Sequence, residues 1–170
     1  MAAGLLERFE DRVAPLLDDA YTLARHILRN EHDAQDVVQE AYLRAWRHYA
    51  DFRGGDERPW LLTIVRNCCY TWQRSQRGRD DVSYDDDRHG LCESALSATD
   101  AKAVATSERE ALASAIATLP PEFREALVLR EIQGFSYREI AQITGVPIGT
   151  VMSRLARSRD QLRRSLKRTA

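Results

Sequence analysis

Positive charge is concentrated near the end of the chain, in the stretch GVPIGTVMSRLARSRDQLRRSLKR that runs from Gly145 to Arg168. Seven of its side chains are Arg or Lys and only one, Asp160, is acidic. A dense run of cations of this kind suits the phosphate backbone of a nucleic acid. Because the 170-residue chain has a net charge of −1, this positive charge is a local feature rather than a bulk property.

The pattern SYREIAQITGVPIGTVMSRL predicts a helix-turn-helix, a pair in which the second helix enters the major groove of duplex DNA. Ser136 and Glu139 have the spacing of a capping box at the start of the first helix. Gly145 ends that helix, and Pro147 lies at the entry to the second. A helical hairpin that binds no DNA is the alternative interpretation.

Only the early turns of the second helix can reach base edges. On a helical wheel, the residues at or beside its outward face are Thr150, Met152, Ser153, Arg154, Ala156 and Arg157. Arg157 has the donors for a bidentate bond to guanine, the commonest specific contact. The cations from Arg163 onward lie late on the helix and supply attraction to phosphates. Ile148, Val151 and Leu155 are expected to face the core.

A second group of basic, aromatic and amide side chains shares one face of a helix predicted at 59–77. Its members are Trp60, Thr63, Arg66, Asn67, Tyr70, Arg74 and Arg77. Cations follow phosphates while rings stack on unpaired bases, so this combination favours single-stranded nucleic acid. A solvated basic face with incidental aromatic rings is the open alternative.

A third face combines charge with large apolar groups on a helix predicted at 33–51. The polar arc of that helix contains Asp36, Gln39, Glu40, Arg44 and Arg47. Leu43 and Trp46 lie within or beside this arc, and apolar groups with a polar rim are typical of a protein-docking surface. The alternative is that Trp46 packs on a neighbouring helix.

The elements that must hold these residues are helices, because β-branched runs are scarce and Ala, Leu, Arg and Glu dominate. Helical periodicity predicts them at 5–29, 33–51, 59–77, 107–118, 121–133, 136–144 and 148–167. Asp33 is expected to cap the second, and Pro59 suits the first turn of the third. Pro120 with Pro121 separates the fourth from the fifth, and Gly134 ends the fifth.

Charge divides the chain into three blocks. Residues 1–75 have a net charge of −2, residues 76–107 of −3 and residues 108–170 of +4. The middle block is polar and lacks sustained helical periodicity, so a linker is the simplest interpretation. The sequence therefore predicts an all-α protein: two small helical domains joined by a flexible linker, the C-terminal one with a helix-turn-helix.

Composition excludes several classes of protein. No apolar stretch approaches the roughly 20 residues that a membrane helix needs. The start MAAGLLERFEDRV lacks the long apolar core of a signal peptide, so we expect a cytoplasmic protein without membrane insertion.

Catalytic and metal chemistry also lack the necessary residues. Cys68, Cys69 and Cys92 have no CxxC spacing, so neither a disulfide framework nor a zinc site is indicated. We expect Cys68 and Cys69 to be buried, while Cys92 lies in a polar stretch where a thiol can react. The histidines are scattered at His26, His32, His48 and His89. We therefore expect no enzyme activity, cofactor or metal.

Two motif blocks in this order resemble one family. AQDVVQEAYLRAWRHYADFRGG…RPWLLTIVRN, followed by LPPEFREALVLREIQGFSYREIAQITGVPIGTVMSRLARSRDQLRRSL, resembles the extracytoplasmic-function (ECF) group of the sigma-70 family of bacterial sigma factors. A lone helix-turn-helix would be far less specific. The resemblance implies a region 2 domain at 1–75, an acidic linker at 76–107 and a region 4 domain at 108–170.

The resemblance also implies roles for the three faces. Residues expected to bind RNA polymerase core are Asp36, Gln39, Glu40, Leu43 and Trp46. Those expected to capture unpaired bases of the −10 element are Phe52, Arg53, Trp60, Arg66, Asn67, Tyr70 and Arg74. Those expected to contact the −35 duplex are Arg138, Thr150, Met152, Ser153, Arg154, Ala156 and Arg157. The implied partners are the β′ clamp helices and β flap of the polymerase, promoter DNA and an anti-sigma factor.

Met152 departs from the family pattern, which often has a basic residue between GTV and SRL. A thioether bonds weakly to guanine or phosphate but can contact a thymine methyl group, so the −35 preference is expected to differ. A stand-alone helix-turn-helix regulator that binds duplex DNA without polymerase is the alternative function.

Overall fold

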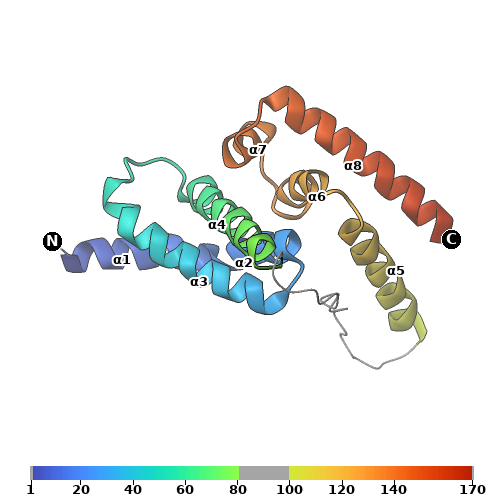
Figure 1. The fold of residues 1–170 in the computed structure, drawn as a ribbon, viewed down its shortest axis with the longest axis horizontal. Coiled ribbons are helices and arrows are strands. Elements are labelled where there is room, and N and C mark those ends of the chain that lie inside the picture. The colour runs from blue at the N-terminus through green and yellow to red at the C-terminus, as the bar shows by residue number, and fades with distance from the viewer. Residues whose placement is uncertain (1, 81–99, 170) are drawn as a thin grey trace.

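The computed structural model describes residues 2–80 and 100–169, which form helices and no strands (Figure 1). The N-terminal domain consists of α1 (Ala2–Val13), α2 (Leu17–Leu28), α3 (Glu31–His48) and α4 (Glu57–Asp80). The C-terminal domain consists of α5 (Asp100–Ala117), α6 (Pro121–Leu127), α7 (Tyr137–Thr144) and α8 (Ile148–Thr169). The predicted all-α architecture of two helical domains is confirmed.

Several helix ends differ from the sequence-based prediction, two of them for a clear local reason. The helix expected at 5–29 is interrupted by a 3₁₀ turn, η1 (Ala14–Leu16), because Pro15 cannot donate a backbone hydrogen bond inside a helix. The cap of α3 is Asn30 rather than Asp33: the Asn30 side chain accepts a hydrogen bond from the Asp33 backbone N–H at 3.0 Å.

The acidic block 76–107 is helical at both of its described ends. Helix α4 continues to Asp80 and α5 begins at Asp100, so helix extends into the block from either side. Residues 81–99, and with them Cys92 and His89, lie outside the described residues.

Small side chains allow the helices of the N-terminal domain to approach closely. Helix α3 buries Ala34, Ala41 and Ala45 completely, against α2 and α4. Phe9 of α1 seals one end of this core with edge-to-face contacts to rings of α3, including that of Trp46 at 5.2 Å. A 3₁₀ turn, η2 (Tyr49–Asp51), then leads into the loop before α4.

The helix-turn-helix forms as predicted. At its start, the Ser136 hydroxyl accepts from the Glu139 N–H at 3.2 Å, and the Glu139 carboxylate accepts from the Ser136 N–H at 2.7 Å. Gly145 ends α7 with a φ of 72°, a conformation that favours glycine. Val151 is buried at the α7–α8 contact as expected, but Ile148 is 43% exposed, so its predicted inward orientation is wrong. Ile148 is the first residue of α8 and precedes the packed stripe.

The two domains lie directly against each other. Helix α4 packs against α7, and α2 packs against α6 and against η3 (Val128–Ile132), a π-helical turn that extends α6. Buried apolar side chains of both domains form one continuous cluster that includes Leu62 of α4 and Ile140 of α7. This packing brings the predicted DNA-binding face of α4 against the C-terminal domain.

Candidate DNA and polymerase interfaces

The predicted polymerase-binding face of α3 is open to solvent. Asp36, Gln39 and Glu40 are exposed, and Leu43 leaves 45% of its surface exposed among them. Trp46 is only partly buried, because one side of its ring packs on Phe9. Thus four of the five predicted residues are exposed for contact. Trp46 instead packs on Phe9 of a neighbouring helix, as the alternative interpretation of this residue predicted.

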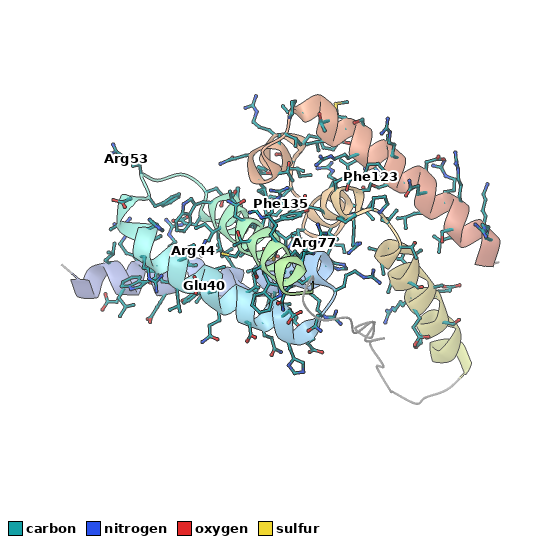
Figure 2. The ribbon with its side chains drawn as sticks, viewed as in Figure 1. Glu40, Arg44, Arg53, Arg77, Phe123 and Phe135 are labelled. Carbon is teal, nitrogen blue, oxygen red and sulfur yellow. The ribbon has the colours of Figure 1, made fainter. Side chains whose placement is uncertain are left out.

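The loop between α3 and α4 combines aromatic rings with one exposed cation. Phe52 lies 4.9 Å from the ring of Trp60 and stacks at 6.1 Å on the buried Tyr49. Arg53 lies at the tip of the loop and extends away from the helices (Figure 2). Gly54, with a φ of 92°, makes the sharp turn that follows it. The loop therefore presents Arg53 beside two partly exposed rings.

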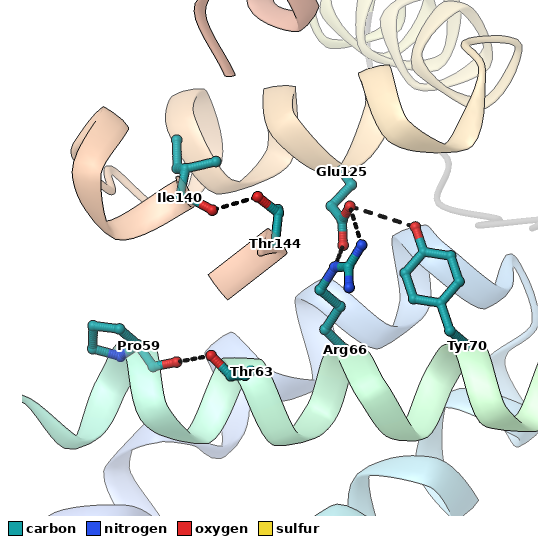
Figure 3. A network of polar contacts seen from close by, with 7 residues as sticks. All are labelled: Pro59, Thr63, Arg66, Tyr70, Glu125, Ile140 and Thr144. Carbon is teal, nitrogen blue, oxygen red and sulfur yellow. Dashed lines mark hydrogen bonds and ion pairs between the residues drawn. The ribbon is translucent and has the colours of Figure 1, made fainter. Parts of the chain in front are cut away.

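The predicted −10 residues on α4 divide into two groups. Asn67 and Arg74 are exposed. Arg66 and Tyr70 instead contact Glu125 of α6: the Arg66 Nε and Nη2 atoms lie 2.5 and 3.4 Å from its carboxylate oxygens, and the Tyr70 hydroxyl lies at 3.4 Å (Figure 3). The guanidinium carbon of Arg66 also lies 4.5 Å from the centre of the Tyr70 ring.

Burial dominates the electrostatics of this cluster. The Glu125 side chain has no exposed surface, and that burial raises the pKa of its carboxyl above the ordinary value of 4.5 although Arg66 opposes the shift. Burial, together with the neighbouring Glu125, raises the pKa of Tyr70 to about 12, so the Tyr70 hydroxyl remains a donor. Arg154 of α8 also lies close enough to favour the carboxylate form of Glu125.

A second group of polar contacts joins the domains at another part of the interface. Arg58 donates to the Asp19 carboxylate and to the Gln133 carbonyl, each at 2.6 Å, and its guanidinium lies 4.1 Å from the centre of the Phe135 ring. The Gln133 side-chain amide in turn donates a 2.7 Å hydrogen bond to the Asp19 backbone carbonyl.

A buried arginine links α6 to the end of α2. Arg124 donates to the carbonyls of His26 and Leu119 at 2.8 and 2.9 Å. Burial lowers the pKa of His26 below the ordinary value of 6.5, and the positive charges of Arg124 and Arg25 lower it further. Sequence reasoning did not identify Glu125, Arg58 or Arg124 as functional residues, since their partners are remote in the chain.

The predicted −35 face lies on the early part of α8 and is mostly exposed. Met152 is 53% exposed, and Ser153, Ala156 and Arg157 are exposed beside it. Thr150 and Arg154 are partly buried. Arg138 is exposed on α7, the first helix of the pair. The helix-turn-helix thus presents these side chains together.

The late cations of α8 are partly neutralised by neighbouring acids. The Arg164 guanidinium lies 2.7 Å from Asp160, and that of Arg159, which precedes the late cations, lies 2.6 Å from Glu131. Such exposed pairs contribute little to stability, and their side chains can be redirected to phosphates at small cost.

The prediction that Cys68 and Cys69 are buried is confirmed: both thiols are free and buried, and burial raises the pKa of Cys69 to about 12. Among the described residues, no cluster of His, Cys, Asp and Glu could hold a metal ion. No described helix is both long enough and apolar enough to cross a membrane.

Two family models match the chain. Sigma-70 region 2 matches residues 12–79, and Sigma-70, region 4 matches residues 109–162. The ECF RNA polymerase sigma factor SigE of Mycolicibacterium smegmatis is 36% identical over 162 residues, which span 91% of this chain but only 60% of that protein. The ECF RNA polymerase sigma-E factor of Haemophilus influenzae is 33% identical over 175 residues, 96% of this chain and 86% of that protein.

Two solved structures with a similar fold are complexes with another protein. The sigma factor RpoE from Bartonella quintana, crystallised with the anti-sigma factor NepR, superposes with a TM-score of 0.74 at 28% identity, over 95% of this chain and 98% of that one. CnrH in complex with the cytosolic domain of CnrY superposes with a TM-score of 0.61 at 26% identity, over 96% of this chain and 88% of that one. The chain therefore belongs to the extracytoplasmic-function group of the sigma-70 family.

Proposed function

We propose that the chain is a dissociable promoter-specificity subunit, which binds RNA polymerase core and directs transcription initiation at its own set of promoters. The observation that carries the proposal is that one chain combines an exposed leucine among acids on α3 with basic and aromatic side chains on α4 and exposed side chains on the early turns of α8. Each DNA-binding face is small. Joining both to the polymerase raises the effective concentration of each at the promoter.

The proposed division of labour follows from the chemistry of each face. The early part of α8 contacts the −35 element as duplex, with Arg157 placed for a base edge and the later cations for phosphates. The loop at Arg53 and the face of α4 capture unpaired bases of the −10 element. Energy gained by stacking and bonding those bases offsets the cost of opening the duplex. No covalent step is required, so the proposed activity is not enzymatic.

The exposed Leu43 and the acids around it form the proposed contact with the polymerase, by family analogy with the β′ clamp helices, while the C-terminal domain contacts the β flap. An anti-sigma factor is a proposed further partner. Support for it comes from the similar folds of RpoE, solved with the anti-sigma factor NepR, and of CnrH, solved with the cytosolic domain of CnrY.

Met152 is the residue that we expect to set the −35 preference apart. Its 53% exposure on the recognition edge places a flexible apolar group where an arginine would favour guanine. Contact with a thymine methyl group suits this side chain better. The promoters used are therefore expected to differ at one −35 position from those of relatives with a basic residue there.

In vitro transcription with purified core polymerase and a genomic promoter library tests the proposal. We expect a defined set of transcripts that requires both the polymerase and this chain. The competing function, a helix-turn-helix regulator that acts without polymerase, predicts tight sequence-specific binding to duplex DNA by the free chain. That result, together with no dependence of transcription on the chain, would overturn the proposal.

A further inference from the structure

A carboxylate of the C-terminal domain occupies the centre of the cationic and aromatic face of α4. Glu125 contributes it from α6, and its side chain is completely buried between the two domains. Arg66 approaches it with two guanidinium nitrogens, at 2.5 and 3.4 Å, and the Tyr70 hydroxyl donates to it at 3.4 Å (Figure 3). All three donors that α4 directs at this point are thus satisfied by one anionic group.

The same donors suit a nucleotide. Arginine pairs with a carboxylate and with a phosphate in the same two-pronged manner, because both present anionic oxygens at similar spacing. The Tyr70 ring beside the Arg66 guanidinium, 4.5 Å away, supplies the stacking surface that an unpaired base would use. Glu125 therefore offers these donors the same kind of anionic oxygens that a DNA phosphate would offer.

We infer that Glu125 is an internal substitute for a DNA phosphate: in the closed arrangement it occupies Arg66 and Tyr70 and keeps the free chain from binding single-stranded DNA until the domains separate. This inference depends on the proposed −10 role of those two residues. It assigns to the C-terminal domain a second task besides contact with duplex DNA, which is to cover the single-strand face of the N-terminal domain.

The contacts made by Arg58 hold the same closed arrangement from another part of the interface. Arg58 bridges the Asp19 carboxylate and the Gln133 carbonyl at 2.6 Å each, and the Gln133 amide bonds to the Asp19 carbonyl at 2.7 Å. Asp19 and Arg58 belong to the N-terminal domain and Gln133 to the C-terminal domain. These bonds hold the end of the α6–η3 segment, which contains Glu125, against α2 and α4.

A closure of this kind is suited to reversal. Removing a carboxylate and a guanidinium from water costs much of what their attraction returns, so a buried ion pair adds little net stability. A DNA strand brings several phosphates and bases at once, and Asn67 and Arg74 remain exposed to receive them. Binding energy from a polymerase and a promoter can therefore shift the chain to the open state.

The direct test replaces Glu125 by glutamine in the full chain, which keeps the shape of the side chain and removes its charge. We expect Glu125→Gln to bind a fluorescent single-stranded DNA of random sequence roughly 3- to 10-fold more tightly than the unaltered chain, since charge-assisted bonds are about twice as strong as neutral ones. We also expect a larger radius of gyration in X-ray scattering. Glu122→Gln, an exposed position on the same helix, is the matched control and should change neither quantity.

A second variant covers the case in which Glu125→Gln fails to fold, as judged by circular dichroism. Gln133→Ala removes the bond to Asp19 without touching Arg66 or Tyr70, and it should likewise expand the chain and tighten binding of the same DNA. Expansion without tighter DNA binding, or neither effect, in a folded variant would overturn the inference.

Transcription by the unaltered chain with core polymerase separates this inference from the proposed function. If the chain directs transcription but Glu125→Gln and Gln133→Ala bind single-stranded DNA no better, only the inference fails. If both variants open and bind more tightly while no promoter is transcribed, the inference stands and the proposed function fails.

Discussion

The proposed docking face of α3 and the proposed DNA-binding face of α4 differ in whether the C-terminal domain covers them. Leu43 on α3 keeps 45% of its surface exposed among solvated acids, whereas Arg66 on α4 is paired with the completely buried Glu125. A mostly polar surface with one apolar anchor is tolerated in water. A cationic face, by contrast, can be covered by an anionic side chain of the same protein, because the charge that attracts DNA also attracts a carboxylate.

The largest effect is expected where the covered interface depends on a buried charge. Arg124→Ala leaves the carbonyls of His26 and Leu119 without their donors and opens a cavity at the domain contact. We expect the free energy of unfolding in urea to fall by about 3 kcal/mol. Arg157→Ala, an exposed position on α8, should change it by less than about 0.5 kcal/mol. Equal values for the two variants would contradict a structural role for the covered interface.

The exposed face should respond in binding rather than in stability. Leu43→Ala removes the apolar anchor of the docking face, and we expect affinity for core polymerase to fall by about 1–2 kcal/mol, roughly 5- to 30-fold. Leu17→Ala is the matched control, since Leu17 is a 37% exposed leucine at the start of α2, a helix that holds none of the predicted polymerase-binding residues. Surface plasmon resonance measures both. If Leu17→Ala weakens binding as much as Leu43→Ala, the docking face is misplaced.

Leu43 is also a better probe than Trp46, for a reason that the sequence alone could not supply. Periodicity placed both side chains beside the same polar arc, but Trp46 packs on Phe9 at 5.2 Å. A change at Trp46 therefore lowers stability and binding together, and the two effects cannot be separated.

Local patterns predicted the elements well, because their causes are local. The capping box at Ser136, the left-handed Gly145 and the buried pair Cys68 and Cys69 each depend on a few neighbouring residues. The failures are local competitions: Asn30 precedes Asp33 as the available cap, and Ile148 lies one turn too early to join the packed stripe.

Local sequence patterns could not predict which part of the chain covers a given helix face. Arg66 and Glu125 are 59 residues apart in sequence, and a helical wheel shows which residues share a face but not what lies opposite. The position of Glu125 in the sequence FREAL gives no spacing signal that identifies its partner. The arrangement of the domains therefore decides which predicted −10 residues are exposed, and periodicity contains no information on it.

Asn67 tests the part of α4 that the C-terminal domain leaves exposed. Asn67→Ala removes one side-chain amide from the proposed base-binding face without touching Glu125. We expect promoter opening, followed by permanganate reactivity of unpaired thymines, to fall by about 1 kcal/mol, roughly 5-fold. Binding to a −35 duplex fragment and the radius of gyration should not change. A greater loss in −35 binding than in opening would count against the −10 assignment of this face.

The smallest expected effect concerns pH, through His26 at the contact of α2 and α6. Burial, Arg124 and Arg25 lower the pKa of His26 in the folded chain, so between that lowered pKa and about 6.5 the unfolded chain binds a proton that the folded chain does not. The contribution of His26 to stability is therefore complete above about pH 6.5 and is lost as the pH falls below it. Urea unfolding of the unaltered chain and of His26→Gln is compared at about pH 7.5 and about pH 5.5. This comparison isolates the contribution of His26, because all other titratable groups, Glu125 included, are present in both proteins. We expect the unaltered chain to lose more stability on acidification than His26→Gln; the same loss in both would show that His26 remains accessible to protons in the closed arrangement.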